Sequence, residues 1–239
     1  MATESSLKKG TKASKSKKKT DKKKRNFTPP PPEKIDKIIA ILGETHPDAK
    51  VALRFNNPLE ILVATILSAQ CTDERVNKVT KTLFNRYRTA QDYAEADMDE
   101  LRDIIRSTGF FNQKSKYIVE MAKGLVAKFN GKVPDNMDDL ITLPGVARKT
   151  ANVVLSAAFG KSEGIVVDTH VKRVSFRLGL TDQTNPEKIE KDLMKIIPKD
   201  KWIFMGIALI FHGRRFCKAR KPLCDDCSLS ELCPSAFSF

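Results

Sequence analysis

The chain has 239 residues, 41% of them hydrophobic, which is enough for a core in one large domain or in two compact halves. Its longest apolar run, 202–211, is about half the length of a membrane span and is better explained as a buried helix, so we expect no membrane contact. The net charge of +14 favours a polyanion as the partner.

Much of the charge lies in residues 1–26. This segment has 11 basic residues and only Glu4 and Asp21 as acids, a net charge of +9, which leaves +5 for the rest of the chain. Because it has almost no apolar residues to bury, we expect a disordered Lys-rich tail. A solvated tail, an electrostatic arm for nucleic acid and a targeting signal all explain it, and no apolar stretch follows that would make it a secretory signal.

Five cysteines without an export signal indicate a reducing compartment, where C-x2-C spacing favours metal binding over disulfides. We therefore expect an intracellular protein, in the cytoplasm or nucleoid of a bacterium or in the nucleus of a eukaryote. Cys71 stands apart from the other four and is expected to be a small buried hydrophobic residue.

Helical periodicity dominates the chain after the tail. Four prolines at 29–32 form a stiff spacer, after which Ile35, Ile38, Ile39 and Leu42 recur at helical spacing. No segment alternates as a strand does, so the predicted fold class is all-α. The further predicted helices are 57–70, 73–87, 97–107, 112–128, 137–143, 148–158, 169–179, 186–197 and 199–211.

A helical hairpin is predicted in the middle of the chain. One helix ends at Leu143, and Pro144, Gly145, Val146 and Ala147 form a tight turn before the next helix. Free backbone N–H groups at the positive start of that second helix can hold a phosphate without reading sequence. From this segment alone, simple packing of two helices explains the pattern as well as a phosphate clamp does.

Lys149 is predicted to point out of the core. Apolar residues between 151 and 158 form the buried stripe of its helix, whereas Lys149, Asn152 and Ser156 share another face. A solvated lysine is the simplest explanation, although a cation is disfavoured by roughly 0.3 to 1 kcal/mol in a first helical turn. The field at this helix end favours the neutral, nucleophilic amine.

Asp168 follows three apolar residues and precedes a helical run, so it is predicted to be a helix N-cap. Helical N–H groups and the helix dipole both favour the ionised carboxylate. Such a carboxylate suits an electrostatic or proton-accepting role beside a reacting lysine.

Four cysteines close the chain in the pattern C-x6-C-x2-C-x5-C, within 17 residues. Thiolates select zinc, copper(I) or iron–sulfur clusters, and four of them leave no coordination position open for a substrate. A structural or redox site is therefore expected, with zinc and iron–sulfur both open. Its ligands are Cys217, Cys224, Cys227 and Cys233.

Together, residues 143–151, residues 167–170 and the four cysteines resemble the endonuclease III family of helix-hairpin-helix DNA glycosylases. The resemblance covers residues 30–234. It implies a base-excision-repair enzyme that removes oxidised pyrimidines from double-stranded DNA and cleaves abasic sites by β-elimination. It also implies a 4Fe–4S cluster on the four cysteines, and a monomer.

The resemblance assigns roles to individual residues. Lys149 matches the nucleophile that attacks the sugar C1′ and holds the sugar as a Schiff base, and Asp168 matches the carboxylate that assists it. Gln70 matches the residue that fills the gap left by the extruded nucleotide, and Phe110 lies at the loop position of an apolar wedge. Asp73 and His170 are expected near the lesion. Expected contacts with the DNA backbone come from Gly145, Val146, Ala147, Lys218, Arg220 and Lys221, although ordinary solvated charge also explains the last three.

The family fold implies a six-helix domain at 51–161 that contains the hairpin, and a second helical domain, made of 27–50 and 162–239, that carries the cluster loop. The active site is expected between them. Two residues depart from the family pattern: Ala147 stands where glycine is frequent, and Phe110 where an aliphatic residue is frequent. We expect Ala147 to crowd a phosphate or to resist an unusual backbone angle, and so to weaken DNA binding.

Two other functions fit part of the sequence. An adenine glycosylase for oxidised-guanine mispairs shares the cluster, but that family lacks the hairpin lysine and adds a C-terminal domain, whereas this chain has Lys149 and stops six residues after Cys233. A non-catalytic DNA-binding module with a structural zinc also fits the four thiolates. The three motifs together favour the lyase.

Overall fold

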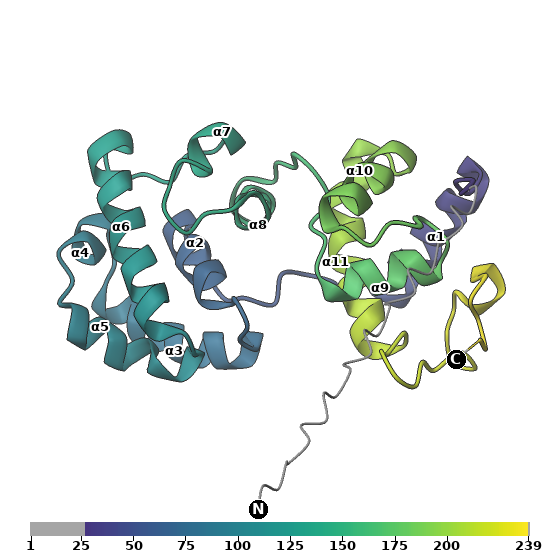
Figure 1. The fold of residues 1–239 in the computed structure, drawn as a ribbon, viewed down its shortest axis with the longest axis horizontal. Helices are drawn as coiled ribbons and strands as arrows, with labels where there is room; N and C mark the ends of the chain where they lie inside the picture. Colours follow the sequence, from purple (N-terminus) through teal and green to yellow (C-terminus); the bar gives the residue numbers. More distant parts are fainter. Residues whose placement is uncertain (1–26, 239) are drawn as a thin grey trace, which may run out of the picture.

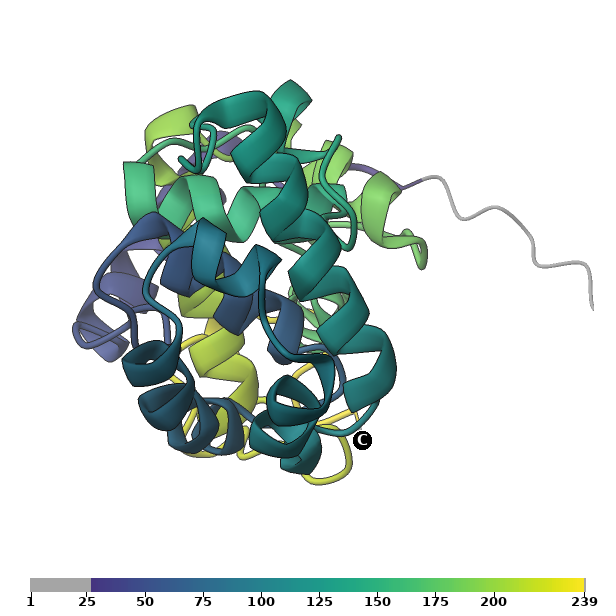
Figure 2. The same ribbon diagram turned by 90° about the vertical axis from the view of Figure 1, so that its left-hand side faces the viewer.

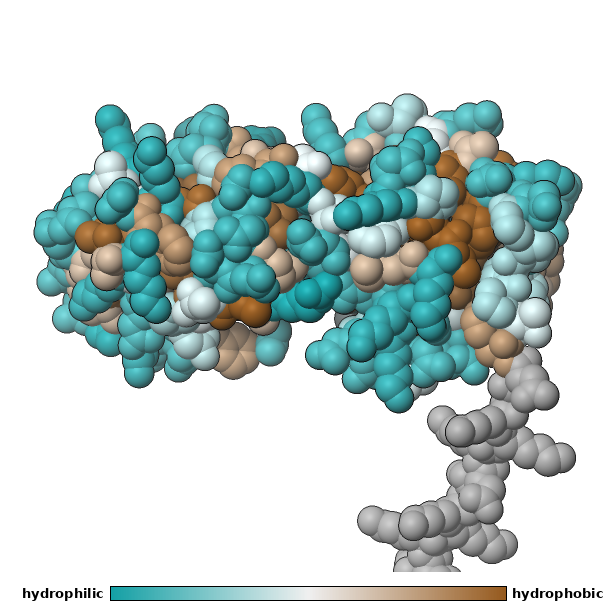
Figure 3. Space-filling model, turned by 90° about the horizontal axis from the view of Figure 1, so that it is seen from above, coloured by the Kyte–Doolittle hydropathy of each residue, from teal (hydrophilic) through white to brown (hydrophobic). Residues whose placement is uncertain are grey.

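The computed structural model describes residues 27–238, so the predicted Lys-rich tail at 1–26 lies outside the described residues. Helices and loops make up this part of the chain, and no strand occurs within it. The prediction of an all-α fold is confirmed. The helices form two lobes that lie side by side (Figure 1), and the molecule narrows where they meet when it is seen from above (Figure 3).

The first lobe surrounds α2, which is apolar on nearly all sides and is buried between α6 and α8. Figure 2 looks onto this lobe, with the long helix α6 in front. A continuous core of leucine, isoleucine and valine side chains joins its helices. The helices are α2 (Pro58–Leu67), α3 (Asp73–Arg86), α4 (Ala90–Ala94), α5 (Met98–Ile105), the 3-10 helix η1 (Arg106–Thr108), α6 (Phe111–Phe129), α7 (Met137–Leu140) and α8 (Arg148–Phe159).

The second lobe is built from both ends of the chain, with its own apolar core. Its first helix packs against its last, so the start of the described chain lies beside the C-terminal loop (Figure 1). The helices are α1 (Pro32–Thr45), α9 (Thr169–Arg177), α10 (Pro186–Ile196) and α11 (Trp202–Arg215), with 3-10 turns at Lys199–Lys201 and Ser230–Leu232. In residues 27–238, no helix has the length and apolar character that a membrane span requires.

Side-chain caps fix most helix starts. Asp168 accepts hydrogen bonds from the first N–H groups of α9, as predicted. The short helix α4 was missed, although Thr89 and Asp92 form a capping box at its start. The predicted helix at 57–70 ends at Leu67, because residues 68–71 turn away from the helix axis and place Gln70 in the left-handed region at φ 53°.

Two expectations about burial are wrong. Cys71 is half-buried against the first core and not enclosed in it. Asn152 does not point to solvent with Lys149: it is 3% exposed, because Glu190 of α10 covers it from the other lobe and accepts a hydrogen bond from its Nδ2 atom at 3.2 Å. Sequence periodicity within one helix does not include such cover from a neighbouring lobe.

Candidate active site and cluster site

A groove of about 370 Å³ lies between the lobes. The first lobe contributes Gln70, Asp73 and Lys149 to its lining, and the second contributes Asp168 and Arg214. Apolar side chains of α11 form part of the wall. Four of the residues that the sequence singled out therefore meet in one cleft, where the segment with Gln70 and Asp73 faces the later residues Lys149 and Asp168.

Lys149 is exposed in the first turn of α8. That turn contains no acidic residue, and within the described chain no hydrogen bond or ion pair holds the Lys149 amine. The neighbouring Arg148 is anchored instead: its Nη2 atom donates to the carbonyl of Glu163 at 3.0 Å and lies 3.5 Å from the Glu190 carboxylate. The helix thus fixes the lysine backbone and leaves its amine available on the groove side.

Asp168 lines the opposite side of the groove, half-buried. Its Oδ1 atom accepts from the N–H groups of His170 and Val171, both at 2.8 Å, so the carboxylate is held by the start of α9. These two bonds use one oxygen, and the second oxygen has no hydrogen-bond partner within residues 27–238. A fixed carboxylate with one available oxygen can accept a proton or stabilise a developing positive charge.

The hairpin before α8 depends on a glycine. Gly145 has φ 77°, and a Cβ atom there would lie 2.8 Å from Cβ of Tyr117. Val146 does not present its side chain to a ligand: it is buried in the first core, and its N–H already bonds to the Leu143 carbonyl at 3.1 Å. Ala147 has φ −83° and ψ 165°, extended backbone that any residue adopts, so the expectation of an unusual backbone angle there is wrong.

The start of α8 still has anion-binding capacity. Ala147 occupies the N-cap position and its side chain makes no capping hydrogen bond. The first amide N–H groups of the helix therefore lack a side-chain cap. Together with exposed Arg148 and Lys149, they form a positively charged edge beside the groove.

Gln70 and Phe110 are exposed at two neighbouring loops. Both have left-handed backbone angles, φ 53° and φ 49°, which are uncommon outside glycine and asparagine. Gln70 lines the groove, whereas Phe110 is 64% exposed and precedes α6. The guanidinium carbon of Arg106 lies 5.3 Å from the centre of the Phe111 ring, which it covers. Of the two neighbouring aromatic residues, Phe110 is therefore the one that projects into solvent.

The two residues expected near a lesion lie in different surroundings. Asp73 lines the groove and its Oδ2 atom accepts from Arg214 of the other lobe at 2.7 Å. His170 is not part of the groove lining: its Nδ1 atom accepts from Arg173 at 3.1 Å, and its ring packs against Gly213. Burial lowers the pKa of His170, while the Asp168 carboxylate acts in the opposite direction.

The four cysteines of the C-terminal loop line one small pocket, together with Arg177 and His212. Burial raises the pKa of the Cys227 and Cys233 thiols, and neighbouring sulfurs raise it further. Four thiols around one pocket fit an iron–sulfur cluster, whose irons bind the cysteines at separate corners. Within residues 27–238, no three potential ligands converge closely enough for a single metal ion.

Two arginines of α9 hold the cluster loop, and sequence reasoning missed both. Arg177 donates to the carbonyls of Lys218 and Ala219 at 2.8 and 3.0 Å and to Sγ of Cys217 at 3.3 Å. Arg173 donates to the carbonyl of Cys217 at 3.0 Å. The only sequence signal was a pair of arginines four residues apart on one helix face.

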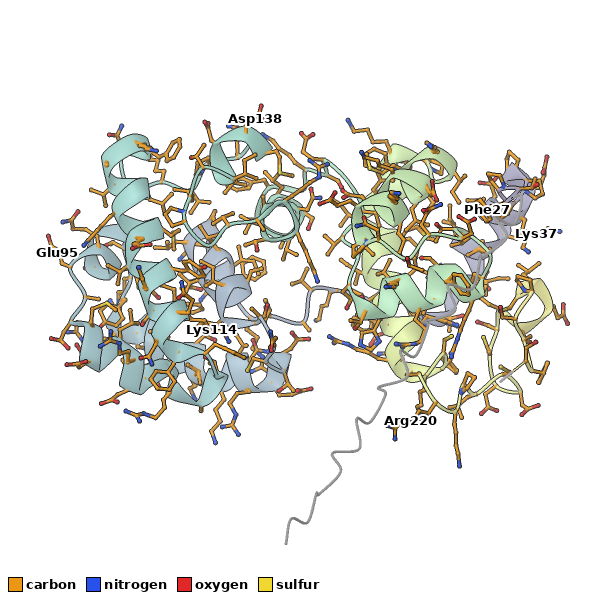
Figure 4. All side chains as sticks on the ribbon, in the orientation of Figure 1. Phe27, Lys37, Glu95, Lys114, Asp138 and Arg220 are labelled. Carbon is orange, nitrogen blue, oxygen red and sulfur yellow. The ribbon has the colours of Figure 1, made fainter. Side chains whose placement is uncertain are left out.

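The loop that these arginines shape exposes Lys218, Arg220 and Lys221. Arg220 lies at the lower edge of the second lobe (Figure 4). Positive side chains on a fixed loop are suited to phosphate contacts.

A buried histidine pair connects α1 to the cluster pocket and was also missed. His46 Nε2 lies 3.3 Å from His212 Nδ1, and His212 Nε2 lies 3.4 Å from Sγ of Cys227. At the outer end, Arg215 donates to His46 Nδ1 at 3.4 Å. Burial lowers the pKa of His212 to about 4, so its ring is neutral at pH 7. The chain of contacts therefore fixes the first helix of the second lobe against the metal site.

Family models match both parts of this architecture. Residues 63–199 match the HhH-GPD superfamily of base excision DNA repair proteins, and residues 217–233 match the iron-sulfur binding domain of endonuclease III. Endonuclease III of Synechocystis sp. is 54% identical over 204 residues, which cover 85% of this chain and 93% of the relative. Endonuclease III of Bacillus subtilis is 45% identical over 202 residues, which cover 84% and 92%.

Solved structures of related proteins have the same fold. The structure of a trapped endonuclease III–DNA covalent intermediate has a TM-score of 0.82 at 46% identity and covers 87% of this chain and 97% of its own. A thermostable thymine-DNA glycosylase has a TM-score of 0.77 at 25% identity, with 87% and 98% covered. The chain therefore belongs to the endonuclease III family: it is a base-excision-repair DNA glycosylase with abasic-site lyase activity and the family's domain for a 4Fe–4S cluster.

Proposed function

We propose that this enzyme removes oxidised pyrimidines from double-stranded DNA and then cleaves the strand through a Schiff base on Lys149. The observation that carries the proposal is the pairing of Lys149 and Asp168, from different lobes, in one groove. The protein whose structure is described as a trapped covalent intermediate with DNA is 46% identical and supports a covalent route.

In the proposed reaction, the neutral amine of Lys149 attacks C1′ of the extruded nucleotide. The glycosidic bond breaks, and the base leaves with its electron pair and takes up a proton. Asp168 stabilises the positive charge that develops on the sugar, and accepts the proton that the attacking amine loses. The C1′–O4′ bond then breaks, O4′ takes up the proton that Asp168 holds, and an iminium forms between Nζ of Lys149 and C1′.

Strand cleavage follows by β-elimination. A proton leaves C2′, the C3′–O bond breaks, and the 3′ phosphate departs with the electron pair. Water then hydrolyses the imine and releases Lys149. The 4Fe–4S cluster takes no part in these steps: when bound, it crosslinks Cys217, Cys224, Cys227 and Cys233 and so fixes the basic loop.

Each lobe has its own core. We propose that the lobes are two domains, 51–161 and 27–50 with 162–239, and that DNA lies across both. Amide groups around Gly145 and Ala147 hold one phosphate, while Lys218, Arg220 and Lys221 meet others. Gln70 and Phe110 enter the gap left by the extruded nucleotide. The enzyme acts as a monomer inside the cell, and Asp73 meets the damaged base.

The test is single-turnover excision from a panel of duplexes that each carry one oxidised pyrimidine, one oxidised guanine opposite adenine, or no damage. We expect release of oxidised pyrimidines and strand cleavage on the 3′ side. Preferential release of adenine opposite oxidised guanine would reject the proposal in favour of the adenine glycosylase. Metal analysis with a visible spectrum tests the zinc module, because an iron–sulfur protein is brown and a zinc protein colourless.

A further inference from the structure

Lys114 is a buried lysine that the proposed reaction does not use. It is 4% exposed on α6, inside the first lobe (Figure 4). Its Nζ atom donates to the carbonyl of Leu67 and to the carbonyl of Thr108, both at 2.8 Å. Burial lowers the pKa of Lys114, which indicates that the enclosed amine costs stability that its two hydrogen bonds must offset.

The two carbonyls that Lys114 joins lie at the C-terminal ends of two separate helices. Leu67 is the last residue of α2, and Thr108 is the last residue of η1. Carbonyls at a helix end have no partner within the helix and attract positive groups. One ammonium group therefore caps both helices, although Lys114 and Leu67 are 47 residues apart in the sequence.

Each capped helix leads directly into one of the projecting loops. Gln70 follows Leu67 by three residues, and Phe110 follows Thr108 by two. Both have left-handed backbone angles, which persist only when the surrounding structure determines them. Within residues 27–238, Lys114 is the side chain that forms hydrogen bonds to the residues where both loops begin.

We propose that Lys114 is a positioning residue that sets the spacing of Gln70 and Phe110, and through them controls extrusion of the damaged nucleotide. This rests on the proposed function, in which these two residues fill the gap in the duplex. Lys114 itself touches neither DNA nor the reacting atoms. It makes the two loops move as one unit, so that both side chains enter the stack together.

The first test needs no DNA. Lys114→Met keeps most of the length of the unbranched side chain and leaves both carbonyls without a donor. Lys116→Met, two residues along the same helix and exposed, is the matched control. Hydrogen exchange should become faster in 68–72 and 107–113 together in Lys114→Met, with α2 and the rest of α6 unchanged. Faster exchange in one loop alone, or throughout the lobe, would overturn the proposal.

The second test uses function. We expect Lys114→Met to slow single-turnover excision of thymine glycol from a duplex by about 10- to 100-fold, the range for small misplacements. The Lys114→Met step should cost less than about twofold when Gln70 and Phe110 are already alanine, because the side chains it places are gone. Two results would contradict this role. One is an excision rate in Lys114→Met equal to that in Lys116→Met, and the other is an equally large fall in rate when Lys114→Met is added to the variant with alanine at Gln70 and Phe110.

Two outcomes separate this inference from the proposed function. If the wild-type enzyme excises no oxidised pyrimidine, the proposed function fails, while the exchange result still decides whether Lys114 couples the loops. If Lys114→Met is poorly folded, Lys114→Gln replaces it, since its polar side chain is one atom shorter than that of lysine and should lose at least one of the two bonds, so that exchange becomes faster in at least one loop. Normal exchange in both loops of Lys114→Gln and normal excision would overturn the coupling.

Discussion

Arg177 Nη1 lies 3.3 Å from Sγ of Cys217 and also donates to the carbonyl of Lys218 at 2.8 Å. One guanidinium from α9 thus contacts a cluster ligand and the basic loop that follows it. Because the loop lacks regular structure for most of its length, its shape depends on such donors as well as on the metal.

Replacing Arg177 with methionine should therefore weaken the cluster site more than it slows the reaction at Lys149. We expect the free energy of unfolding to fall by about 1 to 3 kcal/mol, because the hydrogen bonds that the buried guanidinium donates to the loop are lost. Visible absorbance during oxidation in air should decay faster than in Lys172→Met, an exposed control on the same helix. Equal decay in the two variants would show that Arg177 does not hold the loop.

Glu190 should position the helix that carries Lys149. Its side chain is 13% exposed, accepts from Asn152, and lies beside Arg148, so it joins α10 to the start of α8. Glu190→Ala leaves the buried Asn152 amide unpaired, and we expect a loss of about 1 to 3 kcal/mol in unfolding free energy. Glu187→Ala, exposed on the same helix, is the control.

Activity separates the two roles of Glu190. At a temperature where both variants are folded, single-turnover cleavage of abasic DNA should be slower in Glu190→Ala than in Glu187→Ala, because Lys149 is less well placed. A variant that is less stable but cleaves at the control rate would show that the carboxylate has only a structural role.

The hairpin should respond differently at its two small residues. Gly145→Ala forces a Cβ atom to 2.8 Å from Tyr117 at φ 77°, at a cost of at least about 1 to 2 kcal/mol, and should weaken binding to abasic duplex. Ala147→Gly changes a residue with ordinary extended backbone, so affinity should shift by about twofold or less. Fluorescence anisotropy measures both. A large gain in Ala147→Gly would mean that the Ala147 methyl group crowds the phosphate after all.

Removal of residues 1–26 should weaken binding to undamaged DNA and leave chemistry unchanged. The segment contains 11 basic residues, and the slope of log K against log salt becomes shallower by roughly 0.9 for every phosphate that the tail no longer neutralises. Affinity measured at several salt concentrations gives this slope, and single-turnover excision is the control. An unaltered slope would remove the hypothesis of an electrostatic arm.

The local parts of this site could be predicted from the sequence. Asp168 was identified as an N-cap because the cap depends on the residues beside it in the chain. Lys149 was expected outside the core because helical spacing fixes its direction. The four cysteines revealed a metal site through their spacing alone, and the resemblance to a family selected the iron–sulfur cluster over zinc.

The missed residues have partners that sequence patterns do not contain. Lys114 bonds to a carbonyl 47 residues away, and His46 to a ring 166 residues away. Asn152 seemed solvent-facing because its cover comes from the other lobe. His170 was expected near the lesion from the family resemblance, whereas its side chain packs against Gly213 of α11. Such contacts depend on tertiary packing and become visible only when both partners have been placed.

Trapping with borohydride tests the central claim most directly. The reagent reduces an iminium to a stable amine, so incubation with abasic DNA should give a covalent protein–DNA adduct, and peptide mapping should place the sugar on Lys149. Lys149→Ala should give no adduct, whereas Asp168→Asn should give it about 100-fold or more slowly. No adduct from the wild-type enzyme, or an undiminished adduct in Lys149→Ala, would contradict the account.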